Sequence, residues 1–214
     1  MGDHLNTATR SFRKRKSCPQ RYILVSYDVT GLFTNVPLEE TINILQRDEL
    51  VKLLEIATTN QLFQFDDQLY EQTDGVAMGS PLGPLMANVF ICHLEETLTR
   101  DSLMPHLYRR YVDDTLARMP NTDAATIILP TLNGLHPSLT FTMEPPVDDR
   151  IPFVGIEIIK NGTKLEIEVY RKSINTGLLL HFHSHTDKRY KDSLLKTMLH
   201  RAYVLSSKTE AFDE

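Results

Sequence analysis

Three aspartates are the residues of this sequence whose types and positions best suit chemistry. Asp28 closes an apolar run, Tyr22–Tyr27, whereas Asp113 and Asp114 stand at a tight turn between two short segments with strand character. A carboxylate beside a hydrophobic strand is costly unless water, hydrogen bonds or a metal ion stabilises it. If the two strands are neighbours in a sheet, three carboxylates converge at one edge, where their repulsion favours a divalent cation.

Oxygen ligands in this number suit Mg²⁺, or Mn²⁺, rather than Zn²⁺. The chemistry they would serve is two-metal phosphoryl transfer, in which one ion activates an attacking hydroxyl and the other holds a triphosphate and its leaving group. A second interpretation stays open on spacing alone. In it, Asp28 is a turn former, and Asp113 and Asp114 occupy a solvated hairpin tip.

Two other features lie near these carboxylates in the sequence. Gly79-Ser80-Pro81 precedes a helical pattern, and its glycine would permit close approach of a ligand or a template strand, although such a loop is also an ordinary helix start. Phe33 follows Asp28 by five residues. Its ring would either stack on a sugar beside the carboxylates or fill the core.

The elements that must position these residues follow from apolar spacing. Tyr22–Tyr27 shows little alternation, which predicts a strand buried on both faces in mid-sheet. Pro37 is expected to begin a helix, and residues 84–100, 123–134 and 188–204 have helical spacing. Further strands are expected at residues 139–143, in a hairpin over 62–72, and in a short pair around 111–114. We expect the strand before Val112 to lie beside Tyr22–Tyr27.

A second hairpin is expected over residues 154–170. Asn161-Gly162 is typical of a type I′ turn, which would pair Ile156 with Ile167 and place Glu157 against Glu166. The order of elements predicts an α+β fold, in which an antiparallel sheet is backed by helices and followed by a C-terminal hairpin and helix.

Composition excludes several classes of protein. The 214 residues are 41% hydrophobic with a net charge of −5, which excludes a disordered chain. Two cysteines without framework spacing exclude a disulfide scaffold and indicate an intracellular protein, nuclear or cytoplasmic. There is no secretion signal and no apolar run of about 18 residues, so we expect no membrane association. Charge is uneven, at +5 over residues 1–21, −13 over 22–169 and +3 over 170–214.

Three ordered motifs of the chain resemble motifs A, B and C of reverse transcriptases, and the wording is closest to the Penelope-like branch of retroelements. The resemblance covers roughly residues 22–204. The segments that carry it are Tyr27-Asp28-Val29-Thr30-Gly31-Leu32-Phe33-Thr34-Asn35-Val36-Pro37, Ala77-Met78-Gly79-Ser80-Pro81-Leu82, Tyr111-Val112-Asp113-Asp114, Ile151-Pro152-Phe153-Val154-Gly155, Val169-Tyr170-Arg171-Lys172 and the stretch His181 to His185.

The resemblance implies a role for each matching position. Asp28, Asp113 and Asp114 would be the catalytic carboxylates that hold Mg²⁺, with the Val29 carbonyl as an additional ligand. Backbone N–H groups of residues 30–32 would hold the incoming triphosphate. The resemblance also implies that Phe33 is a steric gate against ribonucleotides, that Gly79 and Ser80 contact template or nucleotide, and that Tyr170, Arg171 and Lys172 form a primer grip.

The implied protein is the palm of a retroelement RNA-directed DNA polymerase, with an RNA template, a DNA primer and deoxynucleotide triphosphates as partners. We expect a basic flexible arm over residues 1–21, a partial palm over 22–172, and a connector with a basic helix toward a missing thumb over 173–214. Met78 stands where many relatives carry glutamine. Because fingers and thumb regions are also missing, the alternative is a truncated, catalytically inactive remnant that at most binds nucleic acid or a partner.

Overall fold

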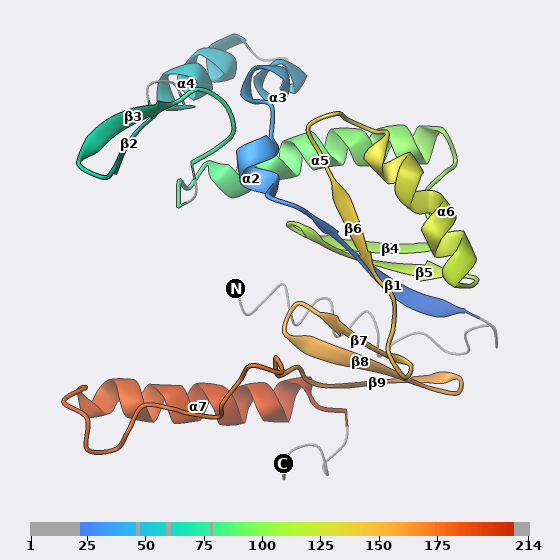
Figure 1. Cartoon of the computed structure of the whole chain (residues 1–214), viewed down its shortest axis with the longest axis vertical. Coiled ribbons are helices and arrows are strands. Elements are labelled where there is room, and N and C mark those ends of the chain that lie inside the picture. The colour runs from blue at the N-terminus through green and yellow to red at the C-terminus, as the bar shows by residue number, and fades with distance from the viewer. Residues whose placement is uncertain (1–21, 46–47, 59–60, 78, 208–214) are drawn as a thin grey trace. The chain divides into compact units, whose positions relative to one another are not determined.

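The structure is a computed structural model, and it describes residues 22–45, 48–58, 61–77 and 79–207. The described residues form two compact units, one of residues 27–144 and one of residues 22–26 with 145–207 (Figure 1). The predicted arm over residues 1–21 and the substitution at Met78 lie outside the described residues. The predicted division at residues 21 and 172 stays a prediction.

A four-stranded sheet with the order β4-β5-β1-β6 carries the motif of Asp28 and that of Asp113 and Asp114. Its central strand is β1 (Ile23–Val29), in which only Ile23 and Asp28 are partly exposed. The prediction of a mid-sheet strand buried on both faces is therefore confirmed. The α+β class with an antiparallel sheet and covering helices is confirmed as well.

The strands β4 (Leu107–Tyr111) and β5 (Asp114–Met119) form a hairpin in which Tyr111 pairs with Asp114. The expectation that the strand before Val112 lies beside β1 is wrong. The strand after it, β5, is the neighbour of β1, and β4 is the outer strand of the sheet. The reason lies in burial, since residues 115–117 are fully buried whereas no residue of β4 is.

Two helices accompany this sheet (Figure 1). In α5 (Gly83–Arg100), one face is buried and consists of Met86, Ala87, Phe90, Ile91, Leu94 and Leu98. The other helix, α6 (Thr122–Asn133), contacts β5 and β6, and the Asn121 side chain caps it by accepting from the Ala124 N–H at 2.8 Å. Apolar burial of both helices holds the sheet that carries the aspartates.

The strand β6 (Phe141–Glu144) has β1 on one side only. On its other side the Asn133 side chain takes the place of a strand. Its carboxamide oxygen accepts from the Phe141 N–H at 2.6 Å, and its amide donates to the Phe141 carbonyl at 3.3 Å. The outward backbone groups of Phe141 are thereby satisfied without a further strand.

Between β1 and α5 the chain forms α2 (Leu32–Asn35), α3 (Leu38–Ile44), α4 (Asp48–Thr58) and the hairpin of β2 (Gln61–Phe65) and β3 (Gln68–Gln72). The expected hairpin is confirmed. Its turn residues Asp66 and Asp67 both have positive φ (49° and 57°), as a type I′ turn requires. Phe63 and Tyr70 stack across it with ring centroids 5.6 Å apart.

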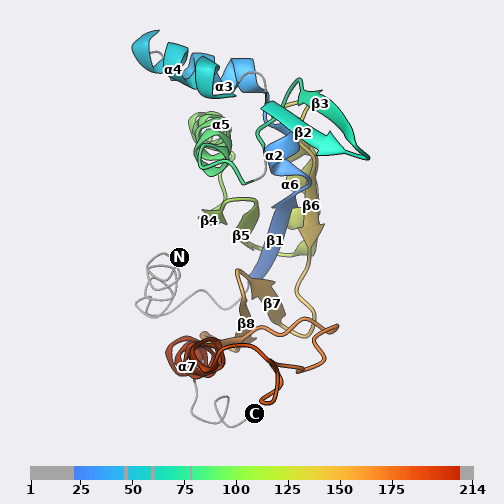
Figure 2. The same cartoon turned by 90° about the vertical axis from the view of Figure 1, so that its left-hand side faces the viewer.

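The other unit contains the sheet β7-β8-β9, formed by β7 (Arg150–Phe153), β8 (Ile156–Asn161) and β9 (Lys164–Val169), together with α7 (Lys188–Leu205) (Figure 2). The helix α7 contacts β9, and the chain beyond it returns to the same strand through the Ser207 N–H, which donates to the Ile167 carbonyl at 2.7 Å. The predicted hairpin and C-terminal helix are confirmed.

The predicted register of the β8–β9 hairpin is wrong. The two-residue turn is Gly162-Thr163, where only Gly162 has positive φ (61°), as in a type II′ turn. Ile156 therefore pairs with Val169, and Glu157 pairs with Glu168. Arg150 on β7 donates to both of these carboxylates at 2.7 and 2.6 Å, and it neutralises the like-charge pair.

Among the described residues, no helix combines the length and the apolar composition needed to cross a bilayer.

Candidate active site

Asp28 is the penultimate residue of the central strand β1. Its neighbours Tyr27 and Val29 are buried, and the Tyr27 hydroxyl donates to the Ala125 carbonyl of α6 at 2.9 Å. Because successive side chains of a strand point to opposite faces, Asp28 lies on the face away from that contact, where it is half-buried. The central strand thus fixes the backbone from which this carboxylate projects.

Asp113 and Asp114 come from the tight turn between β4 and β5. Val112 and Asp113 are its two central residues, and Asp114 is the first residue of β5. Val112 has φ of 57°, in the left-handed region that a β-branched side chain rarely adopts. Such a conformation costs about 1–3 kcal/mol and persists only where surrounding contacts hold it. The turn is therefore a strained element that carries two carboxylates.

The charges of the three aspartates act on one another. Burial and then the Asp113 carboxylate raise the pKa of Asp28, while a backbone hydrogen bond with Val29 opposes the rise. Burial, followed by the charges of Asp113, Asp28 and Glu144, raises the pKa of Asp114 to about 6. The fold therefore gathers carboxylates from β1 and from the β4–β5 turn, and it penalises their simultaneous ionisation.

The donor set at this place consists only of carboxylate oxygens, which is the ligand type of Mg²⁺ and Mn²⁺. In the part of the chain that the structure describes, no three His, Cys, Asp or Glu side chains converge tightly enough to form a ready metal site. The neighbouring carboxylates nevertheless raise the pKa of Asp28 and of Asp114, and a bound cation would offset this repulsion. The residues fit a divalent cation by their chemistry and charge.

The loop after β1 turns directly into the short helix α2. Gly31 precedes that helix with φ of 59°, and the Asn35 side chain donates to the carbonyls of Thr30 and Gly31 at 3.1 and 3.0 Å. The expectation that the N–H groups of residues 30–32 are all available to a triphosphate is wrong at Thr30. Its N–H donates to the Thr140 carbonyl at 2.9 Å, because β1 and β6 pair there.

The segment of the second motif packs on this loop. The Val76 N–H donates to the Phe33 carbonyl at 2.7 Å, and the Gly75 α-carbon lies so close that a β-carbon there would stand 2.6 Å from the Thr34 carbonyl oxygen. Gly83 borders the Phe33 ring, because a β-carbon built on Gly83 would lie 3.6 Å from that ring. The half-buried Phe33, in α2, thus packs against the start of α5.

Gly79 and Ser80 occupy the exposed part of the same segment. Gly79 has φ of 92°, and a β-carbon built there would meet no atom within 4 Å. The Ser80 N–H donates to the Ala77 carbonyl at 3.1 Å, and its hydroxyl accepts from the Leu82 N–H at 3.3 Å. Open space beside Gly79 leaves room for a ligand, while Ser80 mainly stabilises the approach to α5.

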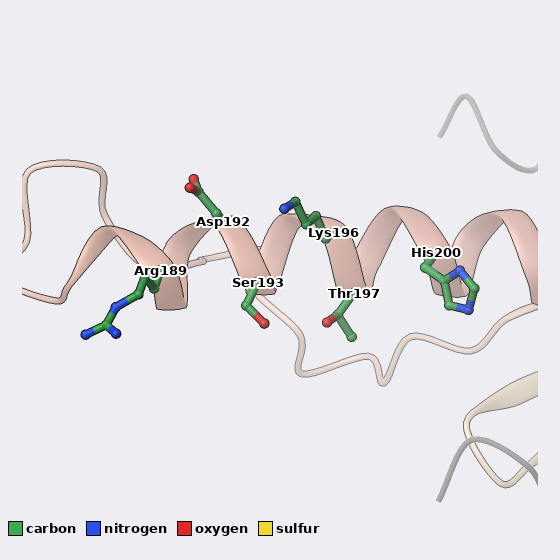
Figure 3. A pocket seen from close by; sticks show the side chains of 6 residues that line it. All are labelled: Arg189, Asp192, Ser193, Lys196, Thr197 and His200. Atoms are coloured by element: carbon green, nitrogen blue, oxygen red, sulfur yellow. The ribbon is translucent and has the colours of Figure 1, made fainter.

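The remaining predicted site residues belong to the other unit. The Tyr170 N–H donates to the Gly155 carbonyl at 3.2 Å, and Arg171 and Lys172 are exposed. Further along, α7 borders an open surface hollow of about 730 Å³ lined by Arg189, Asp192, Ser193, Lys196, Thr197 and His200. Asp192 and Lys196 project to one side of the helix, and Arg189, Ser193 and Thr197 project to another (Figure 3). This polar helix carries the predicted basic character.

Two residues near the aspartates escaped the sequence interpretation. Glu144 at the end of β6 adds its charge to Asp114, and nothing in its local sequence marks it. Arg110 on β4 forms an ion pair with Glu95 on α5 at 2.6 Å. A signal for the latter exists, because Asn88, Cys92 and Glu95 recur at helical spacing along α5.

Comparison with known proteins agrees with these motifs. Residues 3–142 match the family described as reverse transcriptase (RNA-dependent DNA polymerase), and residues 178–214 match the animal helix-turn-helix domain. Within the latter range, the described residues contain one helix, α7, after an irregular stretch. The comparison with curated proteins gives no match.

Solved structures of telomerase share the fold. The apo telomerase of Candida tropicalis has a TM-score of 0.60 and 13% identity, over 94% of this chain and 40% of that chain. The telomerase of Candida albicans in complex with a TWJ fragment of telomeric RNA has a TM-score of 0.59 and 14% identity, over 93% of this chain and 38% of that chain. At these identities the likeness concerns the fold alone.

This chain spans about two-fifths of the length of those telomerase chains. The match to the reverse transcriptase family model, over residues 3–142, covers more than half of the 214 residues of this chain. On that match, which includes both the Asp28 strand and the Asp113-Asp114 turn, the chain belongs to the reverse transcriptase (RNA-dependent DNA polymerase) family.

Proposed function

We propose that the chain is the palm region of a retroelement RNA-directed DNA polymerase, which transfers a deoxynucleotidyl group to a primer 3′-hydroxyl. The observation that carries this proposal is the mutual electrostatic influence of Asp28, Asp113 and Asp114, which come from strands far apart in the sequence. Carboxylates that repel one another in the absence of a cation suit a centre that binds divalent cations during catalysis.

In this proposal Asp28 and Asp113 are the main ligands of Mg²⁺ or Mn²⁺, with Asp114 and the Val29 carbonyl beside them. When bound, the ions would lower the pKa of the primer hydroxyl and stabilise the charge of the leaving pyrophosphate. Phe33 would exclude a ribose 2′-hydroxyl, since α2 positions its ring against Gly83 at the start of α5. The open space at Gly79 would admit the template or the nucleotide.

The proposed partners are an RNA template, a DNA primer and deoxynucleotide triphosphates. Tyr170, Arg171 and Lys172 would form the primer grip, since the two cations are exposed where phosphates could reach them. We assign the chain to the Penelope-like branch on the basis of its short sequence motifs. One such string, Ile151-Pro152-Phe153-Val154-Gly155, covers the last three residues of β7 and the turn to β8, in which Val154 and Gly155 have positive φ (47° and 74°).

The first test is the binding of Mn²⁺, which broadens the NMR signals of nearby amides. We expect selective broadening at residues 28–31 and 112–115 in the wild-type chain and its loss in Asp113→Asn. The matched control is Asp101→Asn, an exposed carboxylate at the end of α5, which should broaden as the wild type does. Equal broadening in Asp113→Asn and wild type would reject the site.

The second test is extension of a DNA primer on an RNA template with Mg²⁺ or Mn²⁺. Because the chain spans about two-fifths of the telomerase chains that share its fold, we expect little synthesis by these 214 residues alone, and synthesis by the polymerase that carries this palm. Asp113→Asn should abolish it. Synthesis that survives Asp113→Asn contradicts the assignment, whereas a chain without metal binding or synthesis fits the inactive remnant.

A further inference from the structure

The side chain of Arg110 connects α5 to the turn that carries Asp113. Its guanidinium contacts the Glu95 carboxylate at 2.6 and 3.3 Å, the Asn88 side-chain oxygen at 3.0 Å and the Cys92 sulfur at 3.4 Å. A further N–H donates to the Val112 carbonyl at 3.1 Å. One cation on β4 therefore bonds a helix face and a turn backbone at the same time.

This arrangement is almost closed to solvent. The Arg110 side chain is 8% exposed and that of Glu95 is 20% exposed. A guanidinium presents its donors in a rigid planar fork, so several acceptors at fixed positions hold it in one orientation. Breaking such a pair would leave the other charge buried without compensation.

The contact to Val112 matters because of where that carbonyl lies. The carbonyl of Val112 and the N–H of Asp113 belong to one planar peptide group. A contact that fixes the Val112 carbonyl therefore also fixes the orientation of the peptide plane that leads into Asp113. Val112 has φ of 57°, a strained conformation that needs an external contact to persist. Arg110 supplies that contact from β4, and Glu95 on α5, a helix with a buried apolar face, holds the guanidinium in place.

We propose that Arg110, held by Glu95, is a positioning residue that keeps the strained Val112–Asp113 peptide oriented so that the Asp113 carboxylate can share a cation with Asp28. This inference rests on the proposed function. Arg110 contacts neither metal nor substrate in it, and it acts through the turn backbone. Lysine cannot replace it, because an ammonium lacks the fork that reaches Glu95, Asn88 and Val112 together.

The test measures Mn²⁺ affinity from the broadening at residues 28–31 and 112–115 in the whole chain. Loss of a residue that orients a metal ligand weakens metal binding about 10- to 100-fold, and we expect about tenfold for Arg110→Lys. Glu95→Gln should give a smaller loss in the same direction, since glutamine keeps one acceptor oxygen. Ile91→Val is the matched control, because it loosens the buried face of the same helix without touching Arg110, and its affinity should equal that of the wild type.

Asp113→Asn is run in parallel to separate the two levels of the proposal. If Asp113→Asn binds Mn²⁺ as the wild type does, the site itself is rejected and the inference falls with it. If Asp113→Asn loses binding while Arg110→Lys and Glu95→Gln, shown folded by circular dichroism, bind normally, only the positioning role is overturned. Should Arg110→Lys fail to fold, Glu95→Gln decides alone. A loss in Ile91→Val equal to that in Arg110→Lys would also overturn the role.

Discussion

Replacing Asp114 with asparagine should stabilise the metal-free chain at neutral pH, although it removes a residue of the proposed site. Burial and the charges of Asp113, Asp28 and Glu144 raise the pKa of Asp114 to about 6, from 3.8 without these influences. A carboxyl whose pKa is higher in the folded than in the unfolded chain destabilises the fold while it is ionised. Asparagine has nearly the same shape and cannot ionise.

The size of the effect follows from the two pKa values. The interval from 3.8 to about 6 corresponds to about 3 kcal/mol, at about 1.4 kcal/mol per pH unit. Because Asp114 is only half-buried, solvent screening reduces this to about 1–2 kcal/mol. The penalty is fully present above about pH 6, and it disappears as the pH falls toward 3.8 and the wild-type carboxyl takes up its proton.

Urea unfolding in the presence of EDTA measures the difference. We expect the free energy of unfolding of Asp114→Asn to exceed that of the wild type near pH 8, and the two to coincide near pH 4. Added Mn²⁺ should close the gap near pH 8, because a bound cation stabilises the wild-type carboxylates. A variant less stable than wild type near pH 8, or a difference that does not change with pH, would refute the reasoning.

Three further predictions concern the surroundings of the site. Gly75→Ala should cost about 2–5 kcal/mol of unfolding free energy, since Gly75 has φ of +76° and the new β-carbon would stand 2.6 Å from the Thr34 carbonyl oxygen. Gly162→Ala, which has open space around it, should cost about 1 kcal/mol, and equal losses in the two variants would contradict the close packing at Gly75. Tyr27→Phe should cost about 1–2 kcal/mol in urea unfolding, because it leaves the Ala125 carbonyl without the hydroxyl that donates to it, and an unchanged midpoint would show that contact to be unimportant. Phe33→Ala should raise the affinity for a ribonucleoside triphosphate relative to its deoxy counterpart in titration calorimetry, while Phe65→Ala on the exposed hairpin should leave the ratio unchanged; a constant ratio in Phe33→Ala would reject the steric gate.

The strongest patterns of the sequence identified elements correctly. The run Tyr22–Tyr27, in which apolar and polar residues do not alternate, correctly predicted a central strand, because a strand covered on both faces has few polar positions. The β2–β3 hairpin followed from two aspartates between apolar runs, since Asp tolerates the positive φ values of a tight turn. These features depend on local chemistry.

Features that depend on distant partners could not be predicted. Both possible registers of the β8–β9 hairpin put Ile156, Ile158 and Ile167 on one face, so the apolar pattern does not choose between them. In the observed register, Arg150 on β7 bridges Glu157 and Glu168, a contact that the hairpin sequence does not contain. Likewise, burial decides which of β4 and β5 lies beside β1.

The site divides in the same way. The positions of Asp28, Asp113 and Asp114 at strand ends were visible in the sequence. The left-handed φ of Val112 was not, because valine is among the residues least suited to it. The Arg110 contacts also join residues from two elements, and only the folded chain places them together.

The Asn133 side chain has a consequence for assembly. An outermost strand with free amide and carbonyl groups is a template on which another chain can add a strand. Here a carboxamide occupies both outward groups of Phe141, so a foreign strand would have to displace it before pairing at that residue. Association through strand addition to this sheet is thereby disfavoured along β6, and a single amide side chain accomplishes what other proteins achieve with a proline or a lysine.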